Sequence, residues 1–205
     1  GIYRNNKIIY TGPRKLVTDI DQYPMPNLGK FINKNIKRVK ITTSRGCPNR
    51  CSFCCLDVIS HRIWRPRNIN KVADEIESIL KKYYWIKEIG FIDDTATLDN
   101  KRMINLCKEI IRRNIKKRFY CQGRIKPISK EMFYWMQKAG FVEICFGIET
   151  GSEKLLKSIH KGITKEDCIN TFNLLKEIKN LKPVKFLIVG LSGEDEETIR
   201  ETIEF

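Results

Sequence analysis

The chain has 205 residues and carries 39 Lys and Arg against 24 Asp and Glu, which gives a net charge of +15 at pH 7. Its 41% hydrophobic and 31% charged residues are typical of a folded domain, so a mainly disordered protein is excluded. No apolar run is long enough to cross a membrane and the first residues lack the apolar core of a signal peptide, so we expect a cytoplasmic protein without a membrane partner.

The first 38 residues differ in pattern from the rest of the chain. Two short apolar runs flank Asn5 and Asn6 and can pair as a hairpin. Pro24 and Pro26 then interrupt any regular structure. We therefore expect residues 1–38 to be a lead-in or linker and residues 39–205 to form the folded core.

From residue 39 onward, short β-rich runs alternate with amphipathic helical patterns. The five predicted strands cover residues 39–43, 89–92, 119–121, 141–148 and 184–191. Helices are predicted between them, and the expected cap residues are Asp99, Ser129 and Thr164 at N-termini and Gly140 at a C-terminus. The helix after Thr164 is predicted to extend to residue 180, and another begins near Glu196.

Repeated strand–helix units predict a parallel sheet with right-handed crossovers. A closed barrel of this kind needs about eight units and ~250 residues, more than this chain contains. The chain also stops at Phe205 within a predicted helix, where no C-cap signal is present. We therefore expect an α/β fold that is a partial TIM-like (β/α) barrel of about five βα units, truncated at its C-terminus.

The strongest sequence feature is a group of three cysteines, Cys47, Cys51 and Cys54, directly after the first predicted strand. The carboxyl ends of parallel strands are where α/β proteins build their sites. Thiolates suit iron–sulfur clusters or zinc, but zinc favours four ligands, usually in two pairs, and no second pair is present here. Three thiolates would leave one iron of a four-iron cluster open, whereas ferredoxins use four cysteines. The spacing favours an open cluster over zinc or a metal-free cysteine group.

This cysteine motif, with Phe53 before the third cysteine, resembles the radical S-adenosylmethionine (SAM) superfamily. The segments 91–95, 145–152 and 189–194 are similar to its cobalamin-binding branch, and the resemblance covers roughly residues 18–205. It implies that Cys47, Cys51 and Cys54 bind a [4Fe-4S] cluster whose open iron chelates SAM. Electron transfer then cleaves SAM and releases a 5′-deoxyadenosyl radical. Cobalamin would be bound by a domain absent from this chain.

The same resemblance assigns SAM contacts to residues near the ends of the predicted strands. It places Phe53 by the adenine, Asp93 and Asp94 at the methionine amino group, Arg124 and Gln122 at the carboxylate, Glu149 at the ribose, and Gly190 and Ser192 at the adenine. Simpler alternatives stay open for most of them: core packing for the phenylalanine, a solvated turn or a helix N-cap pair for the two aspartates, a helix cap for the glutamate, a surface ion pair for the arginine and a turn for the glycine segment. Cys107, Cys145 and Cys168 fit packing positions, while Cys55 and Cys121 are left open.

Three functions are compatible with these residues. The first is a radical SAM enzyme core for methyl transfer or a related radical modification with cobalamin, acting on a small-molecule substrate with an electron donor such as flavodoxin or ferredoxin. The second is an RNA-modifying enzyme that resembles the methylthiotransferases, which the net charge favours slightly. The third is a zinc-stabilised module that binds nucleic acid. Nucleic acid is the less favoured partner because the second zinc ligand pair is missing.

Overall fold

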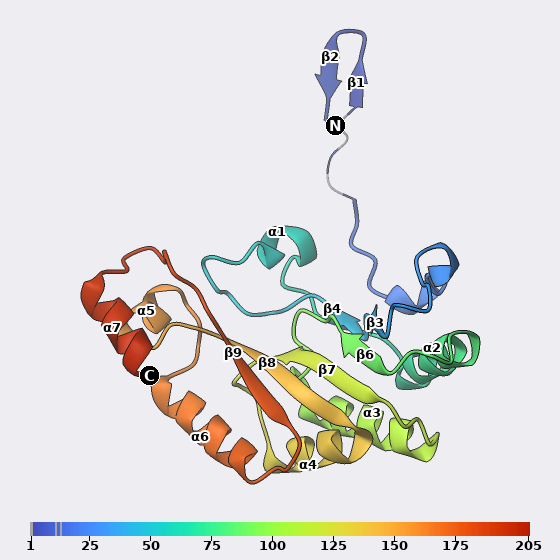
Figure 1. Ribbon diagram of the computed structural model, residues 1–205. Helices are drawn as coiled ribbons and strands as arrows, with labels where there is room; N and C mark the ends of the chain where they lie inside the picture. The colour runs from blue at the N-terminus through green and yellow to red at the C-terminus, as the bar shows by residue number, and fades with distance from the viewer. Residues whose placement is uncertain (1, 11, 13) are drawn as a thin grey trace.

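The computed structural model describes residues 2–10, 12 and 14–205. At its centre is a five-stranded parallel sheet in the order β3-β6-β7-β8-β9 (Figure 1). The strands are β3 (Arg38–Ile41), β6 (Glu88–Phe91), β7 (Arg118–Gly123), β8 (Phe141–Glu149) and β9 (Lys182–Leu187). All five predicted strands form, so the α/β prediction is confirmed, and the strands' carboxyl ends meet at one edge.

The longer helices lie along one side of this sheet, and neighbouring ones pack against each other (Figure 1). The longer ones are α2 (Ile69–Lys82), α3 (Asn100–Arg112), α4 (Lys130–Ala139) and α6 (Lys165–Lys176), and the shorter ones are α1 (Leu56–Ser60), α5 (Glu153–Ser158) and α7 (Glu196–Glu204). Three begin at predicted caps, because Asp99, Ser129 and Thr164 each accept a backbone N–H bond. None of these helices combines the length and the apolar character needed to cross a bilayer.

An aromatic cluster lies on three neighbouring strands of the sheet. The rings of Phe91 on β6, Phe119 on β7 and Phe141 on β8 are fully buried, with centroids 5.3–5.7 Å apart. Pairs in this range gain edge-to-face or offset contacts beyond their buried area. The cluster therefore fixes β6, β7 and β8 against each other and aligns the residues at their carboxyl ends.

The end of the chain differs from the prediction in two places. The last strand was expected over 184–191, but β9 ends at Leu187. Gly190 and Gly193 follow with φ of +93° and +82°, a left-handed conformation that ends extended structure. The helix expected to reach residue 180 ends at Lys176, and Asn180 also adopts a positive φ, +63°. Both segments therefore form turns, although their apolar residues suggested that the strand and the helix continue.

The lead-in contains the predicted hairpin and a second segment that contacts the core. Strands β1 (Ile2–Arg4) and β2 (Lys7–Ile9) pair around Asn5 and Asn6, whose positive φ angles suit a tight two-residue turn. After the hairpin come the short 3₁₀ turns η1 (Ile20–Gln22) and η2 (Leu28–Lys30). The carboxylate of Asp21 in η1 forms an ion pair with Arg67 at 3.0 Å, and Arg67 also pairs with Glu75 of α2 at 2.6 Å. Arg67 therefore joins the lead-in to the first long helix.

We expect Thr164→Ala to destabilise the protein by about 1 kcal/mol, because it removes the side-chain half of the capping box that Thr164 and Asp167 form at α6. The measurement is urea unfolding followed by circular dichroism. Thr18→Ala, at an exposed lead-in position, is the matched control and should change stability by less than about 0.5 kcal/mol. Equal stabilities for the two variants would show that the cap does not stabilise α6.

Candidate functional site

A cavity of about 190 Å³ lies at the carboxyl ends of β6, β7 and β8. Its walls come from the cysteine-containing loop, from the strand ends and from the segment that joins α5 to α6. The predicted site residues among its lining are Cys47, Cys51, Phe53, Cys54, Asp94, Gln122, Arg124 and Glu149. Asp93, Gly190 and Ser192 do not line it. Most of the predicted site thus converges on one cavity.

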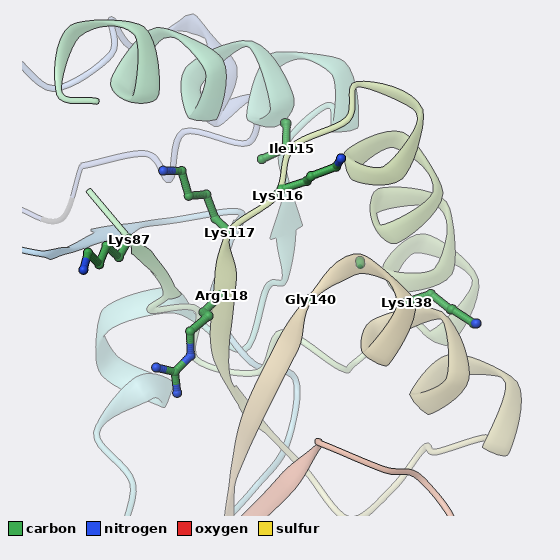
Figure 2. Close-up of a pocket in the computed structure, with 8 residues that line it drawn as sticks. Lys87, Ile115, Lys116, Lys117, Arg118, Lys138 and Gly140 are labelled. Carbon is green, nitrogen blue, oxygen red and sulfur yellow. The ribbon is translucent and has the colours of Figure 1, made fainter. Parts of the chain in front are cut away.

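A second hollow of about 510 Å³ lies at the opposite end of the sheet, where β6, β7 and β8 begin. Its charged lining residues are Lys87, Lys116, Lys117, Arg118 and Lys138. Figure 2 shows their charged ends pointing away from one another and not toward a common centre. Lys117 donates to the carbonyl of Ile86 at 2.7 Å, and Arg118 pairs with Glu88 at 3.0 Å. This hollow is a solvated basic face, and the candidate site is the cysteine-lined cavity.

Two adjacent carboxylates at the end of β6 hold the chain that leads into the cysteines. Asp93 is 1% exposed and accepts hydrogen bonds from the Thr43 N–H at 2.6 Å, the Ser44 hydroxyl at 2.7 Å and the Thr43 hydroxyl. Asp94 accepts from the Gly46 N–H at 2.7 Å. Burial raises the pKa of Asp93, while the bonds from Thr43 and Ser44 oppose that shift. Asp93 therefore fixes the loop and Asp94 faces the cavity.

Gly46 is required by the path of the chain just before Cys47. Its φ is +88°, and a Cβ placed there would lie 2.1 Å from the carbonyl oxygen of Ile63. No side chain fits that space without moving backbone. Beside it, β4 (Ser44–Arg45) pairs with β5 (Arg65–Pro66), so the start of the cysteine loop is held on both sides.

The three cysteine thiols of the motif lie in one cavity wall but differ in their neighbours. The Asn49 amide nitrogen lies 3.1 Å from the Cys47 sulfur, and a guanidinium nitrogen of Arg124 lies 3.6 Å from the Cys51 sulfur. Burial raises the pKa of the Cys54 thiol, and the neighbouring thiols add to that shift. Cys47 is buried and the other two are half-buried.

The donor set of this wall fits an iron–sulfur cluster better than a single metal ion. Among the described residues, no three His, Cys, Asp or Glu side chains are placed to share one ion. A four-iron cluster does not need that convergence, because each cysteine binds a different iron. Nitrogen donors next to the sulfurs also suit the electron-rich thiolates of a cluster.

A buried ion pair on the other side of the cavity includes a residue that sequence reasoning missed. Lys161 is 5% exposed and its ammonium lies 2.5 Å from the carboxylate of Glu149, which is 8% exposed. Glu149 adopts φ of +74° at a register shift between β8 and β9. A Cβ on Gly147 would lie 2.4 Å from the Glu149 carboxylate, so glycine leaves the space for the pair. The sequence does not single out Lys161, because it is one of 39 basic residues.

Several simpler alternatives for the predicted residues do not hold in the structure. Arg124 is 8% exposed and forms no ion pair in the described part of the chain, so it is not a surface ion-pair residue. Phe53 is 43% exposed, with the Lys161 ammonium 5.7 Å from its ring centroid, so it does not pack in the core. Gln122 is exposed at the cavity edge. Cys145, expected as a packing residue, is half-buried and lines the cavity.

Comparisons of the sequence and of the structure with known proteins point to the same group of relatives. The model of the Radical SAM superfamily matches residues 41–205. An uncharacterized methyltransferase of Pyrococcus horikoshii is 31% identical over 206 residues, covering 98% of this chain and 44% of that protein. The radical SAM methyltransferase TsrM of Kitasatospora setae matches with a TM-score of 0.75 at 23% identity, covering 83% of this chain and 34% of TsrM. The cobalamin-dependent SAM radical enzyme OxsB matches with a TM-score of 0.65 at 27% identity, covering 80% of this chain and 26% of OxsB. The chain spans less than half of each.

We expect Lys161→Met to destabilise the fold by about 3–5 kcal/mol, because it leaves the Glu149 carboxylate buried without its cation. The double variant Glu149→Gln, Lys161→Met should recover most of that loss, since no unpaired charge remains. Urea unfolding of both variants and the wild type gives the comparison. A double variant no more stable than Lys161→Met would contradict the pairing.

We expect Asp93→Ala to lower the free energy of unfolding by about 3 kcal/mol, because buried donors of Thr43 and Ser44 lose their acceptor. Asp93→Asn keeps a side chain of the same size with one acceptor oxygen, so it should lower the free energy of unfolding by less. Thermal and urea unfolding measure both changes. If the alanine variant were as stable as the asparagine variant, the carboxylate would not be holding the loop.

Proposed function

The chain belongs to the radical SAM superfamily, whose members use a [4Fe-4S] cluster and SAM, and we propose that Cys47, Cys51 and Cys54 hold the cluster here. The observation that supports this most is that the three thiols line one cavity with nitrogen donors beside two of their sulfurs. When bound, the cluster and SAM supply reductive C–S cleavage and a 5′-deoxyadenosyl radical. We assign residues 39–205 to this core and residues 1–38 to a lead-in.

Arg124 and Asp94 are the proposed partners of the charged end of SAM. The Arg124 guanidinium is buried beside Cys51, forms no ion pair among the described residues and can bind a carboxylate through two N–H groups. Asp94 lines the neighbouring wall with an exposed carboxylate, which suits an ammonium group. Gln122 lies at the same edge and can add a hydrogen bond. Asp93 takes no direct part, because it bonds to Thr43 and Ser44.

The opposite wall is suited to the nucleoside end of SAM. The Glu149 carboxylate can accept hydrogen bonds from ribose hydroxyls, and Lys161 holds that carboxylate in place. The rings of Phe53 and Phe186 both line the cavity and offer apolar surfaces that suit an adenine. Gly190 and Ser192 lie outside the cavity lining, so the proposal gives them no SAM contact.

We propose methyl transfer or a related radical modification of a small molecule as the reaction of the whole protein. The names of the Pyrococcus horikoshii relative and of TsrM support methyl transfer, and the name of OxsB supports a role for cobalamin bound outside this chain. A reductant such as flavodoxin or ferredoxin would supply the electron. We also propose a cytoplasmic location, because an oxygen-sensitive cluster favours a reducing compartment.

The two alternative functions receive less support. A zinc-stabilised module would need ligands that converge on one ion, and the described residues provide no such group. An RNA-modifying enzyme would be favoured by a basic surface that gathers phosphates, but the cations of the basic hollow point apart (Figure 2). We therefore keep the small-molecule enzyme as the proposal.

We expect the protein, purified without oxygen and reconstituted with iron and sulfide, to give a four-iron EPR signal after dithionite reduction. The signal should change when SAM is added, because one iron lacks a cysteine ligand. Cys47→Ala, Cys51→Ala and Cys54→Ala should each lose the signal and most of the bound iron.

Cys55→Ala is the matched control for these variants. Cys55 is adjacent to Cys54 but is exposed and does not line the cavity, so its loss should leave the signal and its SAM response unchanged. Zinc in place of iron, or a four-iron signal that ignores SAM in the wild type, would overturn the proposal. Loss of the signal in the Cys55 variant would overturn the ligand assignment.

A further inference from the structure

Asn49 lies inside the cysteine motif, and its side chain turns back onto the first cysteine of that motif. Its amide nitrogen is 3.1 Å from the Cys47 sulfur, within the range of an N–H···S hydrogen bond. The side chain of Asn49 makes no other hydrogen bond in the described part of the chain. A carboxamide NH₂ can only donate, so the sulfur is its acceptor.

Thr95 also approaches the Cys47 sulfur but does not supply a second donor. Its hydroxyl lies 3.5 Å from that sulfur and 2.6 Å from the carbonyl oxygen of Asp94. A hydroxyl has one proton, and the shorter contact to a strong acceptor takes it. Asn49 is therefore the side chain that donates to Cys47.

The loop around Asn49 is held in a fixed position. Gly46 cannot be replaced without displacing the backbone near Ile63, and the Ser52 N–H donates to the Ile159 carbonyl at 2.9 Å beyond the α5 helix. Asn49 lies between these two attachments and is half-buried. The backbone that carries its amide is thus restrained on both sides.

We infer that Asn49 is a positioning residue that raises the reduction potential of the cluster proposed at Cys47, Cys51 and Cys54; this inference rests on the proposed function. Reduction adds one electron, and the charge spreads onto the cysteine sulfurs. A hydrogen bond to a sulfur stabilises the more negative reduced state more than the oxidised state. The amide of Asn49 therefore makes the cluster easier to reduce.

Arg124 acts on Cys51 in the same direction but is not the residue to test. Its guanidinium is 3.6 Å from the Cys51 sulfur, a longer contact than that of Asn49. Because the proposed function places Arg124 at the SAM carboxylate, changing it would alter ligand binding and cluster electrostatics together. Asn49 does not line the cavity, so its effect on the potential can be measured by itself.

The test is a redox titration, followed by EPR, of the reconstituted protein without SAM. Asn49→Asp has the size of asparagine but replaces the donor by a carboxylate, so its midpoint potential should be more negative than that of the wild type. Asn49→Ala removes the donor without adding charge and should shift the potential in the same direction by less. Asn173→Asp, at an exposed position on α6, adds the same charge and should leave the potential unchanged.

Each outcome separates this inference from the proposed function. Equal potentials for the wild type and both Asn49 variants would overturn the inference while the four-iron signal stands. Failure of both Asn49 variants to assemble a cluster that the wild type assembles would also overturn it, because Asn49 would then be needed for assembly and not for tuning. Absence of a four-iron signal in the wild type would overturn the proposed function itself.

Discussion

The site depends on the hydrogen bonds that two adjacent carboxylates at the end of β6 accept from the chain leaving β3. Asp93 lies where a charge is costly to bury, and it remains there because Thr43 and Ser44 surround it with donors. Asp94, one residue later, points to the other side and accepts from Gly46. The pair therefore fixes the backbone immediately before Cys47 from the end of a neighbouring strand.

The parallel sheet explains how residues distant in the sequence reach this loop. Each strand of the set β6, β7 and β8 ends at the same edge, and buried aromatic rings hold the three in register. Residues at or just beyond these strand ends therefore line the cavity. Asp94 follows β6, Arg124 follows β7 and Glu149 is the last residue of β8, and all three line the cavity. Because the strands are parallel, a strand–helix repeat is enough to bring two carboxylates and a guanidinium to the same edge of the sheet.

Sequence reasoning predicted the parts of the molecule that depend on short-range pattern. The five strands, the caps at Asp99, Ser129 and Thr164, and the cysteine group follow from residue type and spacing within a few positions. The role of Asp93 as a holder of the loop could not be predicted, because it depends on a donor set about 50 residues away. Lys161 and Asn49 were missed for the same kind of reason: a lysine in a basic chain and an asparagine in a loop carry no signal until the fold shows their partners.

The charges left unpaired in the cavity limit what it can bind. Lys161 and Glu149 neutralise each other within the wall, whereas Arg124 has no acid partner among the described residues and the exposed carboxylate of Asp94 meets only a backbone N–H and no basic side chain. These two opposite charges stand on neighbouring strands beside the thiols, an arrangement that complements a ligand carrying a carboxylate and an ammonium on adjacent atoms. The amino-acid end of SAM has that charge pattern.

A neutral ligand, or one with a single charge, would leave either a buried guanidinium or a carboxylate without a partner. Electrostatics thus supports an amino-acid-like group next to the cysteines independently of the spacing of the cysteines themselves.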